Sequence, residues 1–253
     1  MRVASLGSGS QGNATLIAEG DLLVLVDSGF SAIEIERRMA RLGCHPSDLA
    51  AILLTHEHAD HTTGVGPLSR KYDAPVWTTP GTHAAVRDNR FADTRFITLE
   101  QPFTLGGLRI TPFAVPHDAR EPCQFRFDAD GRGLGLLTDA GSITPHIVEA
   151  LQGCDALLLE FNYDPEMLAR GPYPPALRRR IDGAWGHLSN HQARCFLDQR
   201  NCPRLNQVAA MHISEKNNTR GKVDDMLRAA SISERCDLTI ASQDEGFGWL
   251  TVE

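Results

Sequence analysis

The sequence of 253 residues lacks the features that would assign a class of protein at once. No apolar run approaches the roughly 20 residues of a membrane-spanning helix, and the N-terminal Met1–Gly7 segment is too polar for a secretory signal. No Cys-x-x-Cys pair is present, which argues against a disulfide framework or a thiolate zinc site. We therefore expect a cytoplasmic protein without a membrane partner and with free thiols. The cysteines are Cys44, Cys123, Cys154, Cys195, Cys202 and Cys236.

An excess of basic residues is also missing. The formal net charge is −7, with 25 Lys and Arg against 32 Asp and Glu. Proteins that coat nucleic acid normally need a basic face, so that class is disfavoured. A nucleic-acid enzyme stays open, because bound divalent ions would supply positive charge locally. No segment has linker or low-complexity composition and no internal repeat is evident, so we expect one domain over residues 1–253.

Short apolar runs alternate with helical patterns along the chain. Strands are predicted at 13–17, 22–26, 51–55, 74–78, 95–99, 109–115, 124–127, 135–138, 156–159, 208–211, 239–241 and 247–252. Helices are predicted at 31–42, 66–72, 144–151, 188–199 and 223–230. Ser31 and Glu34 form a predicted capping box at the start of the first helix, and Gly43 follows its end. Strands and helices mixed in this way imply a layered α/β fold.

Six predicted strands are each followed by a carboxylate or an imidazole. These residues are Asp27, His56, His117, Asp139, Glu160 and His212. In open α/β sheets, ligands bind in the crevice beyond the carboxyl ends of the strands. Six repetitions are hard to reconcile with unrelated helix caps and core histidines, so we expect these side chains to form one site.

The most specific pattern is His-Glu-His-Ala-Asp-His at residues 56–61. His56 and His58 are two residues apart, so in an extended segment their rings point the same way. Asp60 and His61 come from the turn that follows and can serve a neighbouring ion. Four nitrogen and oxygen ligands in six residues suit zinc, manganese or iron better than calcium or a soft metal.

This His-x-His-x-Asp-His motif resembles that of the metallo-β-lactamase superfamily. The resemblance implies an αββα sandwich, two packed mixed β-sheets with helices outside, and a hydrolase with two divalent transition-metal ions. The implied ligands are His56, His58 and His117 for one ion, Asp60, His61 and His212 for the second, and Asp139 as a bridge. Asp27 would hold the motif loop from behind, as a partner that orients a ligand.

Further motifs are similar to those of the YycJ/WalJ group, small bacterial members taken to be 5′→3′ exodeoxyribonucleases. They are Ser8–Asn13, Tyr173-Pro174, Arg180-Ile181, Gly186–Asn190 and His212–Asn218. Gln11 departs from the pattern, in which a second serine is expected. The resemblance spans nearly the whole chain and implies single-stranded DNA as substrate. The expected substrate contacts are Ser8, Gly9, Ser10, Asn13, Asn217 and Asn218.

Glu160 and His187 are the predicted proton donor pair. In the related tRNA 3′-processing enzymes a Glu–His pair protonates the leaving oxygen, and by similarity Glu160 would orient His187. Two metal ions would activate a bridging hydroxide for in-line attack. A sugar alkoxide needs a proton more than a thioester does, so phosphodiester hydrolysis is favoured. The predicted catalytic residues are Asp60, Glu160 and His187.

Other functions of the same fold stay open. An acyl, thioester or lactone hydrolase is the main alternative. An iron oxidoreductase would carry Glu where His58 stands, and a regulatory module without turnover would not need the full ligand set. The interval between Asp139 and His212 is too short for the β-CASP insertion of RNase J-type enzymes, which excludes an RNase J-like ribonuclease.

Several local features allow two interpretations. The glycines at 7, 9 and 12 match a dinucleotide fingerprint, but a strand is predicted after them, which favours a phosphate-binding or plain turn. Tyr163, Tyr173 and Trp185 could stack bases or pack a loop. Basic residues at 170, 178–180, 216, 220 and 222 could form a phosphate track or a solvated face. Asp118 and Asp164 are interpreted as capping or loop residues.

Overall fold

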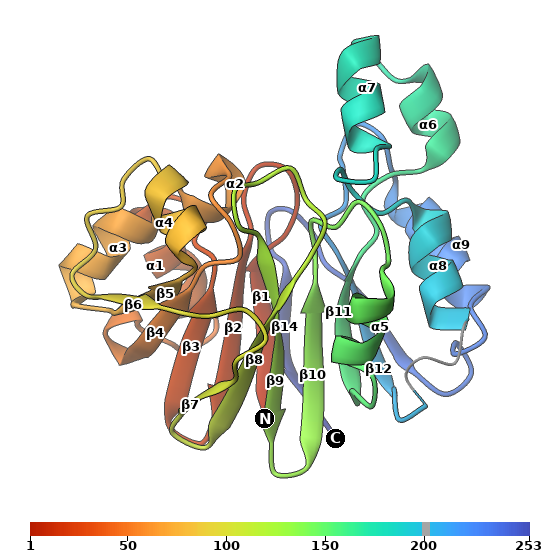
Figure 1. Cartoon of the computed structure of the whole chain (residues 1–253). Helices are drawn as coiled ribbons and strands as arrows, with labels where there is room; N and C mark the ends of the chain where they lie inside the picture. The colour runs from red at the N-terminus through yellow and green to blue at the C-terminus, as the bar shows by residue number, and fades with distance from the viewer. Residues whose placement is uncertain (199–202) are drawn as a thin grey trace.

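Two seven-stranded β-sheets pack face to face and carry helices on their outer faces (Figure 1). The computed structural model describes residues 1–198 and 203–253. The predicted αββα sandwich is confirmed. Both sheets direct one edge, the edge where their parallel strands end, toward the loops that carry the predicted site.

The first sheet has the strand order β14-β1-β2-β3-β4-β5-β6. Its strands are β1 (Arg2–Gly7), β2 (Ala14–Glu19), β3 (Leu22–Val26), β4 (Leu49–Leu53), β5 (Val76–Thr78), β6 (Thr94–Phe96) and β14 (Phe247–Thr251). Strands β14, β1, β2 and β3 pair in an antiparallel manner, whereas β3, β4, β5 and β6 pair in parallel.

The second sheet has the order β13-β12-β11-β10-β9-β8-β7. Its strands are β7 (Phe103–Leu105), β8 (Leu108–Ala114), β9 (Cys123–Ala129), β10 (Arg132–Leu137), β11 (Ala156–Glu160), β12 (Gln207–Met211) and β13 (Asp237–Ile240). Strands β7 to β10 are antiparallel and β10 to β13 are parallel. Each sheet thus runs from an antiparallel meander into parallel strands, a structural repeat that the residues of the two halves do not reveal.

The helices lie mainly on the outer faces of the two sheets. They are α1 (Ala32–Arg41), α2 (Ala59–Thr62), α3 (Val65–Tyr72), α4 (Pro80–Ala85), α5 (Pro145–Leu151), α6 (Pro165–Arg170), α7 (Pro175–Ile181), α8 (Asn190–Asp198) and α9 (Arg220–Arg228), with a 3₁₀ turn at Pro46–Asp48. Helices α6 and α7 stand apart from these layers and project above the sheet edge (Figure 1). In the described ranges, no helix combines the length and apolar character needed to cross a membrane.

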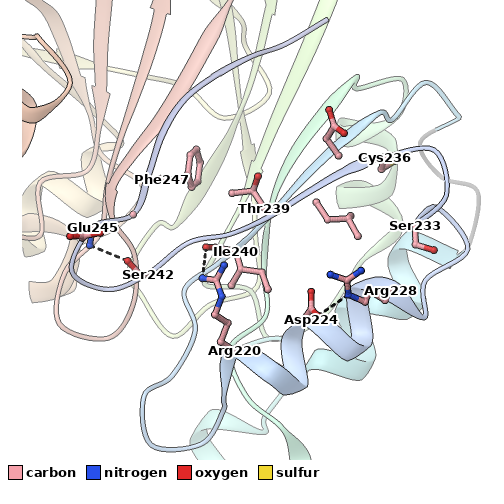
Figure 2. A pocket seen from close by; sticks show the side chains of 13 residues that line it. Arg220, Asp224, Arg228, Ser233, Cys236, Thr239, Ile240, Ser242, Glu245 and Phe247 are labelled. Atoms are coloured by element: carbon pink, nitrogen blue, oxygen red, sulfur yellow. Dashed lines mark hydrogen bonds and ion pairs between the residues drawn. The ribbon is translucent and has the colours of Figure 1, made fainter.

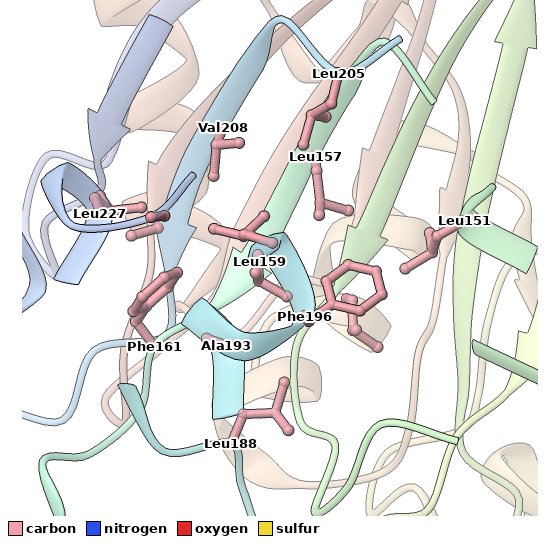
Figure 3. Close-up of a cluster of buried hydrophobic side chains, with 14 of the residues drawn as sticks. Leu151, Leu157, Leu159, Phe161, Leu188, Ala193, Phe196, Leu205, Val208 and Leu227 are labelled. Carbon is pink, nitrogen blue, oxygen red and sulfur yellow. The ribbon is translucent and has the colours of Figure 1, made fainter. Parts of the chain in front are cut away.

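Burial of strand β11 on both faces explains why its sequence is an unbroken apolar run. Leu157 and Leu159 face the cluster under α5 and α8, which Figure 3 draws with Phe196. Ala156 and Leu158 point the other way, into the core between the sheets. Strands covered on both faces lose the alternation of apolar and polar residues. Full burial of each leucine contributes about 1.5–3 kcal/mol, so this strand anchors both layers.

Strand β4 ends two residues earlier than predicted. The amide of Leu54 still bonds to Trp77 of the neighbouring strand segment, at 2.9 Å. The next amide, of Thr55, turns instead to Oδ1 of Asp27, also at 2.9 Å. A side chain thereby replaces the sheet partner and releases the motif loop from the strand.

The predicted capping box of α1 forms only in half. Ser31 Oγ accepts from the amide of Glu34 at 3.3 Å, and Gly43 after the helix has a φ of 72°. The Glu34 carboxylate does not return to Ser31, because it pairs with Arg37 and Arg38 at 2.6 and 2.7 Å. Thr144 caps α5 as predicted, with its side chain accepting from the amide of Ile147.

Several elements escaped prediction because their apolar runs are short. These are β1, β7, α2, α4, α6 and α7. Asp164-Pro165 before α6 is a cap and first-turn proline, a usable signal. The predicted helix 188–199 is α8, and its Gln199 lies outside the described residues, as does Cys202. Cys44, Cys123, Cys195 and Cys236 carry free thiols.

Candidate metal centre

The seven predicted metal ligands converge where strands of both sheets end. They are His56, His58, Asp60, His61, His117, Asp139 and His212. They form overlapping groups whose ligand atoms lie within 4.8 Å of one another, namely His56–His58–His117, Asp60–His61–His212 and His56–His61–Asp139. Strands β4, β8, β10 and β12 each end within a few residues of a ligand.

Three imidazoles form the first group. Nδ1 of His58 lies 3.1 Å from Nε2 of His56 and 3.2 Å from Nε2 of His117. Nitrogens on a tetrahedral ion at roughly 2.0–2.1 Å would lie about 3.3 Å apart, so this spacing fits a shared ion. Burial, joined by the nearby charge of His61, holds the pKa of His56 well below its usual value. The His56 ring is therefore neutral and offers a lone pair.

The second group combines a carboxylate with two imidazoles. Oδ2 of Asp60 lies 3.5 Å from Nε2 of His61 and 3.5 Å from Nε2 of His212. Burial lowers the pKa of His61, but the charges of Asp139, Asp27 and Asp60 outweigh it and raise that pKa well above its usual value. Such a concentration of negative charge around one ring is a favourable environment for a cation.

Asp139 lies between the two groups. Its Oδ2 is 3.3 Å from Nε2 of His61, and its Oδ1 is 3.9 Å from Nε2 of His117. Asp139 Oδ2 and His212 Nε2 are buried without a hydrogen-bond partner within residues 1–198 and 203–253. A buried polar atom left unpaired costs about 1–3 kcal/mol of stability. Both atoms are therefore expected to bind a group from outside the chain. The residues present therefore fit a metal centre.

Hydrogen bonds behind the site fix the ring tautomers. Thr55 Oγ1 donates to Oδ2 of Asp27 at 2.8 Å and lies 2.9 Å from Nδ1 of His56, from which it accepts. The same Asp27 oxygen accepts from Nδ1 of His61 at 2.7 Å. Nδ1 of His117 donates to the carbonyl of Gly186 at 3.0 Å. These partners accept hydrogen bonds from the Nδ1–H groups, so Nε2 is the ring nitrogen left to face an ion.

Thr55 and Gly186 were not predicted as site residues. Thr55 directly precedes the motif, which is the one signal that the sequence offers for it. Gly186 contributes only its carbonyl group, and no side-chain pattern can reveal a backbone contact of this kind.

Glu160 lies fully buried at the end of β11 and binds two imidazoles. Its Oε1 accepts from Nδ1 of His187 at 2.8 Å and from Nδ1 of His212 at 3.0 Å. Its Oε2 accepts from the amides of Ala140 and Leu188. Burial raises the pKa of Glu160, but the contact with His187 outweighs this and leaves that pKa below its usual value. Glu160 is therefore ionised and orients both rings.

The Ser8–Asn13 loop braces the site from the side. Ser8 Oγ accepts from the amide of His212 at 2.8 Å and donates to Oδ1 of Asn13 at 3.0 Å. The same Asn13 oxygen accepts from the amide of Gly9, and the amide of Gln11 bonds to Gln243. Most amides of this loop thus have protein partners, which favours the plain turn over a phosphate-binding one. Of the predicted contacts here, only Ser10 is exposed.

Asn217 and Asn218 are buried within the loop between β12 and α9. The amide group of Asn218 donates to the carbonyls of Phe161 and Asn162 and exchanges hydrogen bonds with Asn190. The Oδ1 atom of Asn217 has no partner in the described part of the chain. Substrate contact by these residues stays a prediction, while their observed contacts hold the loop in place.

The mouth of the site carries an ion pair that was not predicted. Oδ1 of Asp118 lies 3.6 Å from Nε2 of His117 and 4.0 Å from Nε2 of His58. Oδ2 of Asp118 accepts from Nε of Arg180. Asp118, interpreted from sequence as a loop residue, therefore links the first imidazole group to helix α7.

The three aromatic residues proposed for base stacking have different surroundings. Tyr163 is 2% exposed and donates to Asp182 at 2.6 Å, so its ring packs the loop and cannot reach a base. Tyr173 is half-buried, whereas Trp185 is 63% exposed. Asp164 caps α6, as its loop interpretation predicted.

Apart from the metal centre, a hollow of about 840 Å³ lies between α9 and strand β13 and reaches β14 (Figure 2). Three of its charged side chains, those of Arg220, Asp224 and Arg228, have partners within the protein. Arg228 pairs with Asp224 at 2.7 Å, and Arg220 donates to the carbonyl of Ile240 at 3.2 Å. Among the described residues, no member of the metal-ligand groups lines this hollow. The candidate metal site therefore lies at the strand ends and not here.

Comparisons with known proteins agree with this geometry. The family profile of the beta-lactamase superfamily domain matches residues 23–213. Exodeoxyribonuclease YycJ of Bacillus anthracis is 34% identical over 219 residues, 85% of this chain and 83% of that protein. Exodeoxyribonuclease WalJ of Streptococcus pneumoniae is 33% identical over 221 residues, 85% of this chain and 82% of that protein.

The fold has relatives among solved structures as well. The metallo-beta-lactamase fold protein YhfI from Bacillus subtilis superposes with a TM-score of 0.76 at 16% identity, over 98% of both chains. The metal-ligand groups at the strand ends and the long sequence matches lead to the same assignment. The chain belongs to the metallo-β-lactamase superfamily, within it to the YycJ/WalJ group, and is a metal-dependent hydrolase.

Proposed function

We propose that this hydrolase is a 5′→3′ exonuclease of single-stranded DNA. The observation that carries the proposal is the 2.8 Å contact between Glu160 and His187 at the edge of the metal centre. A carboxylate-anchored imidazole serves as a proton donor, and a sugar alkoxide is a leaving group that needs one. The exodeoxyribonuclease names of the two relatives support the same substrate class.

Two divalent ions per chain are part of the proposal, zinc or manganese, with iron as an alternative. The three imidazoles of the first group would hold one ion, and Asp60, His61 and His212 the other, with Asp139 contacting both. A set of imidazole nitrogens and carboxylate oxygens suits these metals. Bound there, the ions would supply an activated water and offset the negative charge that develops on the phosphate.

The proton comes from the chain itself. Glu160 accepts from Nδ1 of His187, so a protonated His187 carries its second proton on Nε2. Burial lowers the pKa of His187, but the charge of Glu160 outweighs it and raises that pKa above its usual value. His187 is thus held in the form that can donate to the leaving 3′-oxygen, and its side chain is 21% exposed.

Strand binding relies on a few local cations. Arg178, Arg179 and Arg180 lie on α7, and Arg180 bonds to Asp118 at the mouth of the site. Lys222 is paired with Asp164 at 3.0 Å, which leaves it less available to a phosphate. With about two or three phosphate contacts and a slope near −0.7 per contact for a single strand, affinity should depend weakly on salt. The same shortage of cations argues against binding of a long duplex.

The test is digestion of 5′-labelled and 3′-labelled oligonucleotides, linear and circular, with manganese or zinc. Release of mononucleotides from the 5′ end, with circles spared, supports the proposal. Turnover of a thioester or lactone with no DNA cleavage under either metal overturns it in favour of an acyl hydrolase. His58→Ala should abolish the activity. His191→Ala, an exposed histidine on α8, is the matched control and should retain it.

A further inference from the structure

A small pocket of about 210 Å³ opens beside His187, under helix α7. It is lined by Asp118, Tyr173, Leu177, Arg180, Ile181, Gly186 and His187. None of its side chains belongs to the predicted metal ligands. The hydrolytic machinery described above gives no role to Tyr173, Leu177 or Ile181.

The shape and lining of this pocket suit one flat ring system. Leu177 and Ile181 lie one turn apart on α7 and present an apolar wall. Tyr173 supplies an aromatic surface. Pockets for drug-sized ligands begin at roughly 300 Å³, so a smaller pocket admits one base rather than a dinucleotide.

A cation stands at the mouth of the pocket. Arg180 is 56% exposed and bonds to Asp118 through Nε. Its two terminal nitrogens make no hydrogen bond within the described ranges, so they can bind a phosphate in a bidentate manner. Asp118 links this guanidinium to the metal centre, because its other oxygen lies 3.6 Å from Nε2 of His117.

We propose that this pocket binds the nucleobase of the 5′-terminal nucleotide, stacked on Tyr173, with the 5′-phosphate at Arg180. The inference rests on the proposed function, in which His187 protonates the leaving oxygen. Attack at the phosphorus of the second nucleotide breaks its bond to the 3′-oxygen of the first. Water supplies OH to that phosphorus and, through His187, hydrogen to the 3′-oxygen. The departing nucleotide is therefore the terminal one, and it lies on the His187 side.

A pocket that holds a single base also limits each cleavage to one nucleotide. One terminal nucleotide occupies it, is released as a 5′-mononucleotide, and is replaced by the next. A circular strand has no terminal nucleotide to insert, and a paired base cannot enter without leaving its partner.

The experiment uses the metal-loaded full-length protein and two 5′-phosphorylated oligonucleotides. They differ only in the terminal residue, which is either thymidine or a tetrahydrofuran abasic analogue. For the wild type, loss of the base should lower kcat/KM roughly 5- to 150-fold, the worth of one stacked base. Tyr173→Ala should hydrolyse both substrates with equal kcat/KM, while Tyr173→Phe should keep the discrimination. Phe96→Ala, which removes an exposed ring on β6 away from the pocket, is the matched control.

Two outcomes overturn the inference while DNA hydrolysis persists. One is a wild-type enzyme that does not discriminate, and the other is a Tyr173→Ala variant that discriminates as well as the wild type. If no DNA is hydrolysed at all, the proposed function fails, and equilibrium binding of thymidine 5′-monophosphate tests the pocket separately. Weaker binding to Tyr173→Ala than to Phe96→Ala supports the pocket, and equal binding overturns it. Circular dichroism and metal content identify a variant that has not folded.

Discussion

Nδ1 of His187 lies 2.8 Å from Oε1 of Glu160, a carboxylate that is fully buried at the end of β11. Two backbone amides hold the other carboxylate oxygen, so the imidazole is oriented by a group that cannot itself rotate. This arrangement fixes the tautomer of His187 and leaves Nε2 as the ring nitrogen that Glu160 does not bind.

Replacing His187 with Ala should slow hydrolysis of a natural phosphodiester by roughly 10²–10⁴, the usual worth of general acid catalysis. A p-nitrophenyl phosphodiester should lose little, because its leaving group needs almost no protonation. Steady-state rates on both substrates measure the difference. Equal losses would mean that His187 binds substrate or supports the fold instead of donating a proton.

Asp139 should be the residue on which both metal ions depend. Its two oxygens lie near both ligand groups, so Asp139→Ala should release both ions, whereas His117→Ala should mainly empty one site. Elemental analysis of the purified variants gives the metal content per chain. Full occupancy in Asp139→Ala would contradict a bridging position.

Asp27 should control metal affinity without contacting an ion. Asp27→Asn replaces one acceptor oxygen with an NH₂ group. That group would face a donor of Thr55 or of His61, so one of these hydrogen bonds would be lost. Loss of such a supporting contact typically weakens metal binding about 10- to 100-fold. Competition with a chromogenic chelator measures this. Asp21→Asn, a change in an exposed turn, should leave the affinity unchanged.

The core under α8 should dominate stability over exposed apolar positions. Leu157 is fully buried in the cluster of Figure 3, so Leu157→Ala should cost about 2–5 kcal/mol of unfolding free energy through lost burial and a cavity. Ile33 is 76% exposed, and Ile33→Ala should change stability by less than about 0.5 kcal/mol. Urea unfolding of the two variants against the wild type provides the comparison. A loss of the same size in both would show that this cluster does not anchor the layer.

One regularity of the residues predicted a layered α/β fold with a site at the strand ends, and the resemblance to the metallo-β-lactamase superfamily added the αββα sandwich and the ligand set. Polar residues such as Asp27, His56 and Asp139 follow apolar runs, and the carboxyl ends of parallel strands meet at one edge of a sheet. Local spacing also identified the short motif at residues 56–61. These features are encoded by neighbours along the chain, which is why they can be read without coordinates.

Only the tertiary structure determined how those residues are oriented. Ser8 and His212, far apart in the sequence, meet through a 2.8 Å hydrogen bond, and the carbonyl of Gly186 sets the tautomer of His117. Likewise, Tyr163 is buried while Tyr173 lines a pocket, although both were equal candidates for stacking. Contacts between distant segments depend on the packing of whole layers and on backbone groups that every residue shares. No pattern of side chains along the chain can specify them.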